Sequence, residues 1–230
     1  AAVDLDVRRL LLDGTGALAG RLIAELDRTG LWVTAFEADG PALGLSLTGG
    51  LRLDDRSLDL LGAVRVDAPA RLARRLTGRR LDSLATVPGG RFDVALGGRL
   101  DALDVELDGR LGALDARFDG TARPLVDDAL DGTLALSHPD AAALLAQWGA
   151  PVHPRLELPG AAAFDGRVAR GDGVTAAGTF ALGGLEGRLA LADRSVALRD
   201  VAGPLGALHA AAAAFAPWPA DPARLRARVQ

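Results

Sequence analysis

Residues 91–120 alternate apolar and charged side chains with a period of two. Because successive side chains of a β-strand point to opposite faces, this period predicts strands with one apolar face and one charged face. Glycines interrupt the alternation at residues 97–98 and 109–112, which predicts three short strands joined by tight turns. We therefore predict an antiparallel meander whose apolar side chains share one face. These side chains, the candidate groove residues, are Phe92, Val94, Leu96, Leu103, Val105, Leu107, Leu114 and Phe118.

Similar alternation predicts strands over most of the chain. They are expected at residues 3–12, 15–27, 31–39, 42–48, 51–54, 57–66, 162–170, 173–182, 185–191, 195–201 and 207–213. By composition residues 15–27 also fit a helix, although Gly16 and Gly20 disfavour it. Asp-Gly pairs are typical of tight hairpin turns and predict turns here, with some pairs forming bulges within strands. The seven pairs begin at Asp13, Asp39, Asp108, Asp119, Asp131, Asp165 and Asp172.

Two segments break the β pattern and predict short helices. Residues 68–76 and 140–148 are rich in Ala and Leu, and the first is also rich in Arg. The predicted N-caps are Asp67 and Ser137. Each precedes a proline by two residues, and proline is tolerated in the first turn of a helix because its missing N–H needs no partner there.

The segments after the two predicted helices are alike and indicate an internal repeat of about seventy residues. An apolar residue, Pro and Gly stand at residues 87–89 and again at 158–160, and a Phe-Asp pair begins at Phe92 and again at Phe164. We predict residues 1–66 as an N-terminal β-meander, 67–137 and 138–213 as two helix-plus-meander repeats, and 214–230 as a Pro-rich tail. The chain is interpreted as part of a longer one.

The composition narrows the possible functions. Hydrophobic residues make up 49% of the chain and aromatic residues 4%, so Leu, Ala and Val supply most of the apolar surface. Such side chains fill a sheet face without shaping a polar pocket. The 26 basic residues are all arginine, and with 30 acidic residues they leave a net charge of −4 that is spread along the strands. Nucleic acid is therefore not an expected partner, because it requires a dense positive patch. Disulfides and cysteine-ligated zinc are excluded because the chain has no cysteine.

Catalytic chemistry has weak candidates. Ser137 beside His138 suggests a nucleophile and a base, but a helix-cap role for Ser137 with Asp140 accounts for these residues better. Carboxylates alternate with Leu on almost every strand, which is typical of a solvated face rather than of a glycosidase cleft. The Asp-Gly pairs match neither the EF-hand spacing nor the calcium-binding nonapeptide repeat. We expect no catalytic residue, metal or cofactor. A hydrolase would lose its turnover when His138 or His153 is changed to Ala, and we expect no turnover at all.

The ratio of sheet to covering elements leaves two alternatives open. About a dozen predicted strands are apolar on one face, whereas only two short helices are available to cover them. One interpretation is an elongated, curved antiparallel sheet whose meander repeats form a trough or an open sandwich. Exposed apolar surface of that size marks a binding site, and a lipid acyl chain is a natural occupant. The other interpretation is a closed core in which two sheet faces bury each other.

Residues 130–154, LDGTLALSHPDAAALLAQWGAPVHP, are followed from Phe164 by FDGRVARGDGVTAAGTFALGGLEGRLAL. A strand, a short helix ending near Trp-Gly, a proline-rich joint and a glycine-punctuated meander in this order resemble the AsmA-like proteins of Gram-negative bacteria. The resemblance covers residues 57–213, and the related TamB-type proteins share the pattern.

The resemblance implies a periplasmic protein that is held at the inner membrane by an anchor outside these residues. It also implies an apolar trough that carries phospholipids toward the outer membrane or supports outer-membrane assembly. Phospholipid acyl chains are then the expected partners, and the family offers no catalytic motif to carry over. The alternative function is a structural or adhesive β-repeat domain with a closed core and no lipid.

Overall fold

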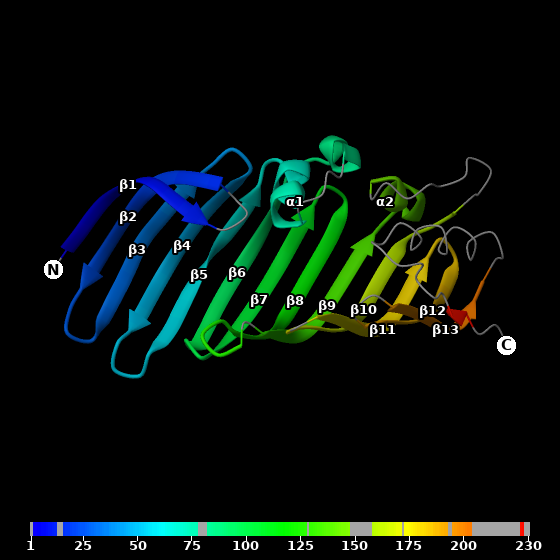
Figure 1. Cartoon of the computed structure of the whole chain (residues 1–230). Helices are drawn as coiled ribbons and strands as arrows, with labels where there is room; N and C mark the ends of the chain where they lie inside the picture. The colour runs from blue at the N-terminus through cyan, green and yellow to red at the C-terminus, as the bar shows by residue number, and fades with distance from the viewer. Residues whose placement is uncertain are drawn as a thin grey trace. The chain divides into compact units, whose positions relative to one another are not determined.

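The computed structural model describes residues 2–12, 16–77, 82–127, 129–147, 158–171, 173–192, 195–203 and 226–227. The described part is mainly β, with fourteen strands, two short α-helices and one 3-10 helix (Figure 1). The predicted fold class, antiparallel β-meanders with two short helices, is confirmed. The chain folds as two compact units, with residues 1–112 and 119–128 in unit 1 and residues 113–118 and 129–230 in unit 2.

Unit 1 contains a meander in which each strand pairs antiparallel with the next one along the chain. Among the described residues, the first strand of this meander pairs only with the second, so the meander is open. Between the fifth and sixth strands lie helix α1 (Pro69–Thr77) and the 3-10 helix η1 (Asp82–Thr86). The strands are β1 (Ala2–Leu12), β2 (Gly16–Leu26), β3 (Gly30–Asp39), β4 (Leu43–Arg52), β5 (Ser57–Val66), β6 (Gly90–Arg99) and β7 (Ala102–Leu111).

Unit 2 contains a second antiparallel meander, with helix α2 (Ala141–Gln147) between its first two strands. The short strand β14 (Arg226–Ala227) pairs in parallel with the last strand of this meander. Strand β8 (Leu114–Arg123) is divided between the units, because its residues up to Phe118 belong to unit 2 and the rest to unit 1. The meander strands are β9 (Ala129–His138), β10 (Ala162–Arg170), β11 (Val174–Leu182), β12 (Leu185–Ala192) and β13 (Ser195–Ala202).

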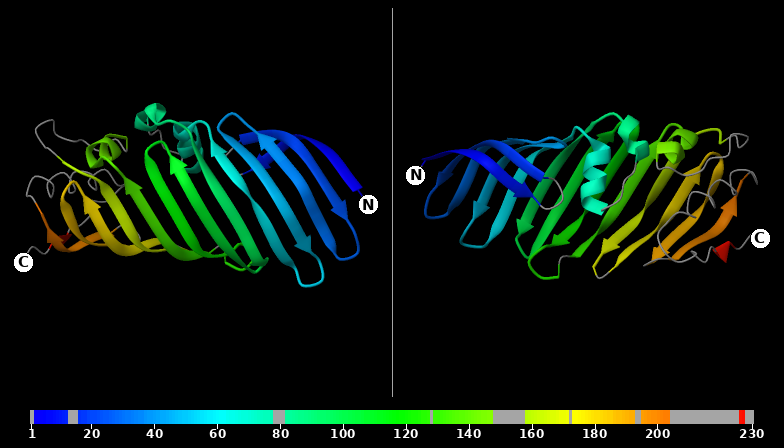
Figure 2. Two further views of the ribbon diagram at one scale, coloured as in Figure 1. Left: turned by 180° about the vertical axis from the view of Figure 1, so that it is seen from behind. Right: turned by 45° about the horizontal axis from the view of Figure 1, so that its top comes forward.

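The two helices are inserted in the same way in their units. Each connects two neighbouring antiparallel strands and lies at the end of that strand pair (Figure 2). At the helix end of the pair, Val66 is opposite Gly90 in unit 1 and His138 is opposite Ala162 in unit 2. Both members of the second pair stand 72 residues after their counterparts (66 to 138, 90 to 162). The structure therefore shows the repeat-like meander that the sequence spacing predicts.

The linkers after the helices repeat in detail as well. Val87 is 7% exposed, and Leu158 is 5% exposed. Each packs beside a glycine with positive φ in the turn two strands later, Gly112 or Gly183. The backbone N–H of each of these glycines donates a hydrogen bond to a linker carbonyl. The Pro-Gly linker thus packs against the turn that follows β7 in unit 1 and against the turn that follows β11 in unit 2.

One strand prediction was wrong because a glycine pair was interpreted as a turn. The strands predicted at residues 42–48 and 51–54 are parts of one strand, β4, which runs from Leu43 to Arg52. Gly49 has a φ of 136°, a conformation that glycine adopts and other residues rarely do, and the strand continues through it. A side chain at Gly50 would meet the ring of Trp32 on β3, which lies across this position. Residues 16–26 form β2, between β1 and β3, so the helical alternative is also wrong.

Most Asp-Gly pairs also lie within strands rather than in turns. Those beginning at Asp108, Asp119, Asp131 and Asp165 belong to β7, β8, β9 and β10. At Gly109 the reason is close packing, because a Cβ atom there would lie 2.8 Å from Cδ1 of Phe92 on β6. The turns predicted at residues 97–98 and 109–112 accordingly begin later, at residues 100 and 112. Asp13, Asp172 and residues 207–213 lie outside the described residues.

The helices begin close to the predicted positions, but the predicted caps differ. The backbone N–H of Ala143 donates to Oδ1 of Asp140 at 2.9 Å, so Asp140 caps α2. Ser137 is an exposed member of β9 and does not occupy the cap position. Asp67 precedes α1, and its carboxylate accepts a hydrogen bond of 2.9 Å from the guanidinium of Arg65.

Candidate functional site

The apolar face of unit 1 is continuous across its strands. The register places Leu47 on β4 beside Gly62 on β5, Gly62 beside Val94 on β6, and Val94 beside Leu107 on β7. The adjacent row of the same face runs from Val64 to Phe92. Most of these side chains are half-buried, so they pack against neighbours on the sheet and keep part of their surface accessible.

Six candidate groove residues lie on this face of unit 1. They are Phe92, Val94 and Leu96 on β6, and Leu103, Val105 and Leu107 on β7. Leu103 is buried and the other five are half-buried, whereas Asp93, Asp104 and Glu106 alternate with them and are exposed. The remaining two candidates, Leu114 and Phe118, lie on the part of β8 that belongs to unit 2. The structure therefore divides the eight predicted residues between two apolar faces.

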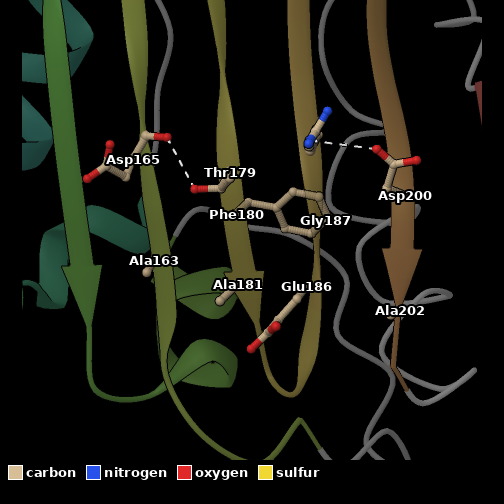
Figure 3. A pocket seen from close by; sticks show the side chains of 10 residues that line it. Ala163, Asp165, Thr179, Phe180, Ala181, Glu186, Gly187, Asp200 and Ala202 are labelled. Carbon is tan, nitrogen blue, oxygen red and sulfur yellow. Dashed lines mark hydrogen bonds and ion pairs between the residues drawn. The ribbon is translucent and has the colours of Figure 1, made fainter.

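The apolar face of unit 2 is built by β9 to β13. Leu136 on β9 is opposite Phe164 on β10, which is in turn opposite Phe180 on β11. The ring of Phe180 lies over Gly187 of β12, where an added Cβ would stand 2.9 Å from Cε1 of the ring (Figure 3). The apolar face continues across β12, where the register places Leu189 opposite Leu198 of β13.

Helix α2 covers one end of this face. Its buried residues Ala141 and Leu145 pack in one cluster with residues from the linker and three strands. The strand and linker members are Leu158, Ala162, Leu182 and Leu185, of which Leu185 is 1% exposed. The cluster is the core of unit 2, and it fixes the helix over the sheet.

Next to this core lies an apolar cavity of about 290 Å³ within unit 2. Leu144 and Leu145 of α2 contribute to one wall. The sheet supplies the rest of the lining, including Leu136, Phe164, Phe180 and Leu189, and Leu114 of β8 lines it as well. The cavity extends along the sheet as far as Val168 and Ala176. Its size is near the lower end of the range for small-molecule sites, and its lining offers contacts to an apolar ligand.

Of the eight candidate groove residues, only Leu114 lines this cavity. The repeat could have indicated another lining residue, Phe164. It stands 72 residues after Phe92 (92 to 164), at the equivalent place in the second repeat. Alternation in residues 162–182 is weaker, since Ala and Gly fill many positions of both faces. Leu144 and Leu145 carry no periodic signal of their own in a helix of seven residues.

The opposite faces of both units carry exposed ion pairs. Arg65 binds Asp39 at 2.7 Å and Asp67 at 2.9 Å, and the hydrogen bonds that it donates to these carboxylates, with Asp67 the larger cause, raise the pKa of its guanidinium. In unit 2, Arg167 binds Asp131 at 2.8 Å, which raises the pKa of Arg167 in the same way. Because these pairs are exposed, this face is a solvated surface. Exposed ion pairs contribute little to stability, since water and salt screen them.

A hollow of about 630 Å³ lies on this charged face of unit 2. Arg188 and Asp200 form an ion pair of 3.6 Å there. The hydroxyl of Thr179 donates a hydrogen bond of 3.4 Å to the backbone oxygen of Asp165 (Figure 3). Glu186 also lines the hollow. Within the described residues, no group of three or more His, Cys, Asp or Glu side chains is arranged to hold a metal ion.

His138 is buried at the end of β9, with 2% of its surface exposed. Its Nδ1 accepts a hydrogen bond of 3.1 Å from the backbone N–H of Asp140, so the imidazole helps to fix the start of α2. Its Nε2 is also buried and has no hydrogen-bond partner among the described residues. His153 and His209 lie outside the described residues.

In the part of the chain that the structure describes, no helix has the length and apolar character needed to cross a membrane. Comparison of the chain with protein-family models, curated proteins and solved structures finds no match in any of the three.

Proposed function

We propose that the chain is a non-enzymatic, lipid-handling β segment of the AsmA-like type, and that its apolar faces receive phospholipid acyl chains. The observation that carries this proposal is the cavity beneath α2 together with the accessible apolar face that continues from it. Hydrocarbon is a matching occupant, because the lining is formed by Leu, Phe, Val and Ala side chains. Each methylene removed from water contributes about 0.8 kcal/mol, so a chain of moderate length gains substantial binding energy.

The second support is the repeat itself. Both units place an apolar sheet face beside a helix that is inserted between neighbouring strands. A strand, helix, proline linker and meander in this order are the features that resemble the AsmA-like and TamB-type proteins. Action in the periplasm, an inner-membrane anchor outside these residues, and transport toward the outer membrane or support of its assembly are implied by the resemblance and belong to the proposal.

The test is lipid retention by the 230-residue chain. We expect native mass spectrometry after gentle purification to detect bound phospholipid. A photo-crosslinking residue at Val94 or Leu136, on the two apolar faces, is expected to capture lipid from phosphatidylethanolamine and phosphatidylglycerol vesicles. Matched controls are Leu61, which is 58% exposed on the charged face of unit 1, and Ala177, which is exposed on the charged face of unit 2.

Crosslinking confined to Val94 and Leu136 supports the proposal. A chain that retains no phospholipid and crosslinks no lipid at either position overturns it and favours a structural or adhesive repeat domain. Equal capture at Leu61 and Ala177 also overturns it, because that result indicates general surface adsorption rather than binding to an apolar face.

A further inference from the structure

Arg170 is the only arginine at the apolar-face positions of strands β9 to β13 in the described residues. The register places Arg170, at the end of β10, opposite Leu130 on β9 and Val174 on β11. These positions continue the rows of Phe164 and Val168, which line the cavity, because residues two apart on a strand share a face. The face thus has α2 at one end and a guanidinium at the other.

Arg170 also differs from the other arginine of β10 in its partners. Arg167 points to the charged face, where Asp131 binds it at 2.8 Å. Arg170 is exposed and has no ion pair or hydrogen bond of its side chain within the described residues. An exposed guanidinium offers donors in a planar fork that matches phosphate geometry. The cation at the end of the apolar face is therefore available to an anionic group.

The apolar face is long enough for an acyl chain and the headgroup that follows it. From Ala162, beneath α2, to Val168 there are six residues, or about 20 Å at ~3.3 Å per residue. The chains of one leaflet fill about half of the ~30 Å hydrocarbon core of a bilayer, or ~15 Å. A chain of that length beginning beneath Leu145 covers about three-quarters of this distance, and the glycerol and phosphate of the lipid extend beyond it toward Val168 and Arg170.

We infer that unit 2 binds its lipid in one orientation, with the end of the acyl chain beneath α2 and the phosphate of the headgroup at Arg170. This inference rests on the proposed function and adds to it a direction of binding and a preference for an anionic headgroup. Unit 1 has no charged side chain at the corresponding positions of the described strands β2 to β7, so the preference belongs to unit 2.

The test compares two single-chain lipids that differ only in the phosphate: lysophosphatidic acid and a monoacylglycerol with the same acyl chain. Binding to the 230-residue chain is measured by equilibrium dialysis below the micellar concentration. We expect about threefold tighter binding of the phosphate form, the size typical of an exposed charge pair, and a smaller ratio at high salt. Arg170→Gln is expected to remove the preference while leaving monoacylglycerol binding unchanged, and Arg170→Lys to retain most of it.

The matched control is Arg199→Gln, which removes the same charge from an exposed arginine on the charged face of β13. The inference is overturned if Arg170→Gln keeps the preference for phosphate, or if Arg199→Gln removes it equally. Equal binding of both lipids by the unaltered chain overturns the orientation and leaves the lipid-handling function standing. Absence of binding by either lipid overturns both.

Discussion

The helices of the two units occupy equivalent places in the repeat and cover their sheets with different side chains. In unit 2, α2 has the sequence AAALLAQ and buries Ala141 and Leu145 against the sheet. In unit 1, α1 has the sequence PARLARRLT, and its exposed Arg71 donates a hydrogen bond of 3.2 Å to the carbonyl oxygen of Pro41. One helix therefore closes one end of an apolar face, whereas the other binds a neighbouring loop through Arg71.

The difference shows that the repeat specifies a backbone and that individual side chains specify a site. Both units place an apolar residue of the linker against a turn glycine, and both keep the helix between paired strands. Within the described residues, only the helix of unit 2 belongs to a core cluster that adjoins the apolar cavity. We therefore regard the face of unit 1 as a continuous apolar surface and that of unit 2 as a partly covered site.

The largest expected effect tests whether the core under α2 is more tightly packed than the open face. Leu185→Ala removes a side chain that is 1% exposed and is expected to cost about 3 kcal/mol, because it leaves a cavity in the core of unit 2. Leu47→Ala, on the half-buried face of unit 1, is expected to cost about 1 kcal/mol, since less apolar area is lost. Urea unfolding followed by circular dichroism measures both. Equal losses would show that the two faces are covered to the same extent.

A smaller effect is expected from filling the cavity. Ala176→Phe places a ring among the lining residues of unit 2 and is expected to weaken binding of a monoacylglycerol about tenfold, by occupying the space of the ligand. Ala177→Phe, on the exposed opposite face of the same strand, is the matched control and leaves binding unchanged. Equilibrium dialysis of the three proteins measures the effect. If both variants bind as the unaltered chain does, the cavity is not the lipid site, and the comparison shifts toward unit 1.

Much of this architecture could be predicted from the sequence, because alternation is a local signal that strand geometry imposes directly. Most of the strands from β1 to β13 follow it, and the spacing of Pro88 and Pro159 identified the repeat before any pairing was known. Glycine was the main source of error. Gly49 and Gly109 were interpreted as turn residues, although each continues a strand, and at Gly109 the ring of Phe92 occupies the space of a side chain.

The candidate site was less predictable, since it depends on contacts between distant segments. Five of the eight predicted groove residues are half-buried on an apolar face of unit 1. The cavity, however, lies in unit 2 and needs Leu145 of α2 beside Ala162 and Leu182. The alternation that identifies a sheet face contains no information on which end of that face a helix covers. The position of α2 is fixed by its packing in the core cluster and by Asp140 at its N-terminus.

One hairpin turn of unit 1 is held by a carboxylate, whereas one turn of unit 2 is closed by a backbone hydrogen bond. In unit 1, Oδ1 of Asp27 accepts hydrogen bonds from the hydroxyl of Thr29 at 2.6 Å and from the backbone N–H groups of Thr29 and Gly30 at 2.7 and 2.9 Å. These bonds, the hydroxyl first, lower the pKa of Asp27 from 3.8 to about 2. In unit 2, the turn after β10 is closed by the backbone N–H of Gly171 donating to the carbonyl of Gly173 at 3.0 Å.

Because the folded pKa of Asp27 is lowered, its contribution to stability is complete above about pH 4 and is lost as pH falls through about 2. We expect the Thr29 and Gly30 amide signals to titrate with a midpoint near 2 in nuclear magnetic resonance spectra, while the amide of Gly171 shows no such step. Asp27→Asn keeps an acceptor oxygen and removes the titration. A midpoint near 3.8 would mean that the carboxylate does not hold this turn.

The smallest effects are expected on the charged faces, where the two units are alike. Arg21 pairs with Asp4 in unit 1 and Arg167 pairs with Asp131 in unit 2, and all four side chains are about half exposed or more. Water and salt screen such pairs, so Arg21→Gln and Arg167→Gln are each expected to leave the urea midpoint unchanged within error and lipid binding unaltered. A loss of lipid binding in either variant would place the ligand on the charged face, because neither arginine lies on an apolar one. It would also remove the basis for assigning the anionic headgroup to Arg170, the one arginine that the register of β9 to β11 places at the end of the apolar rows.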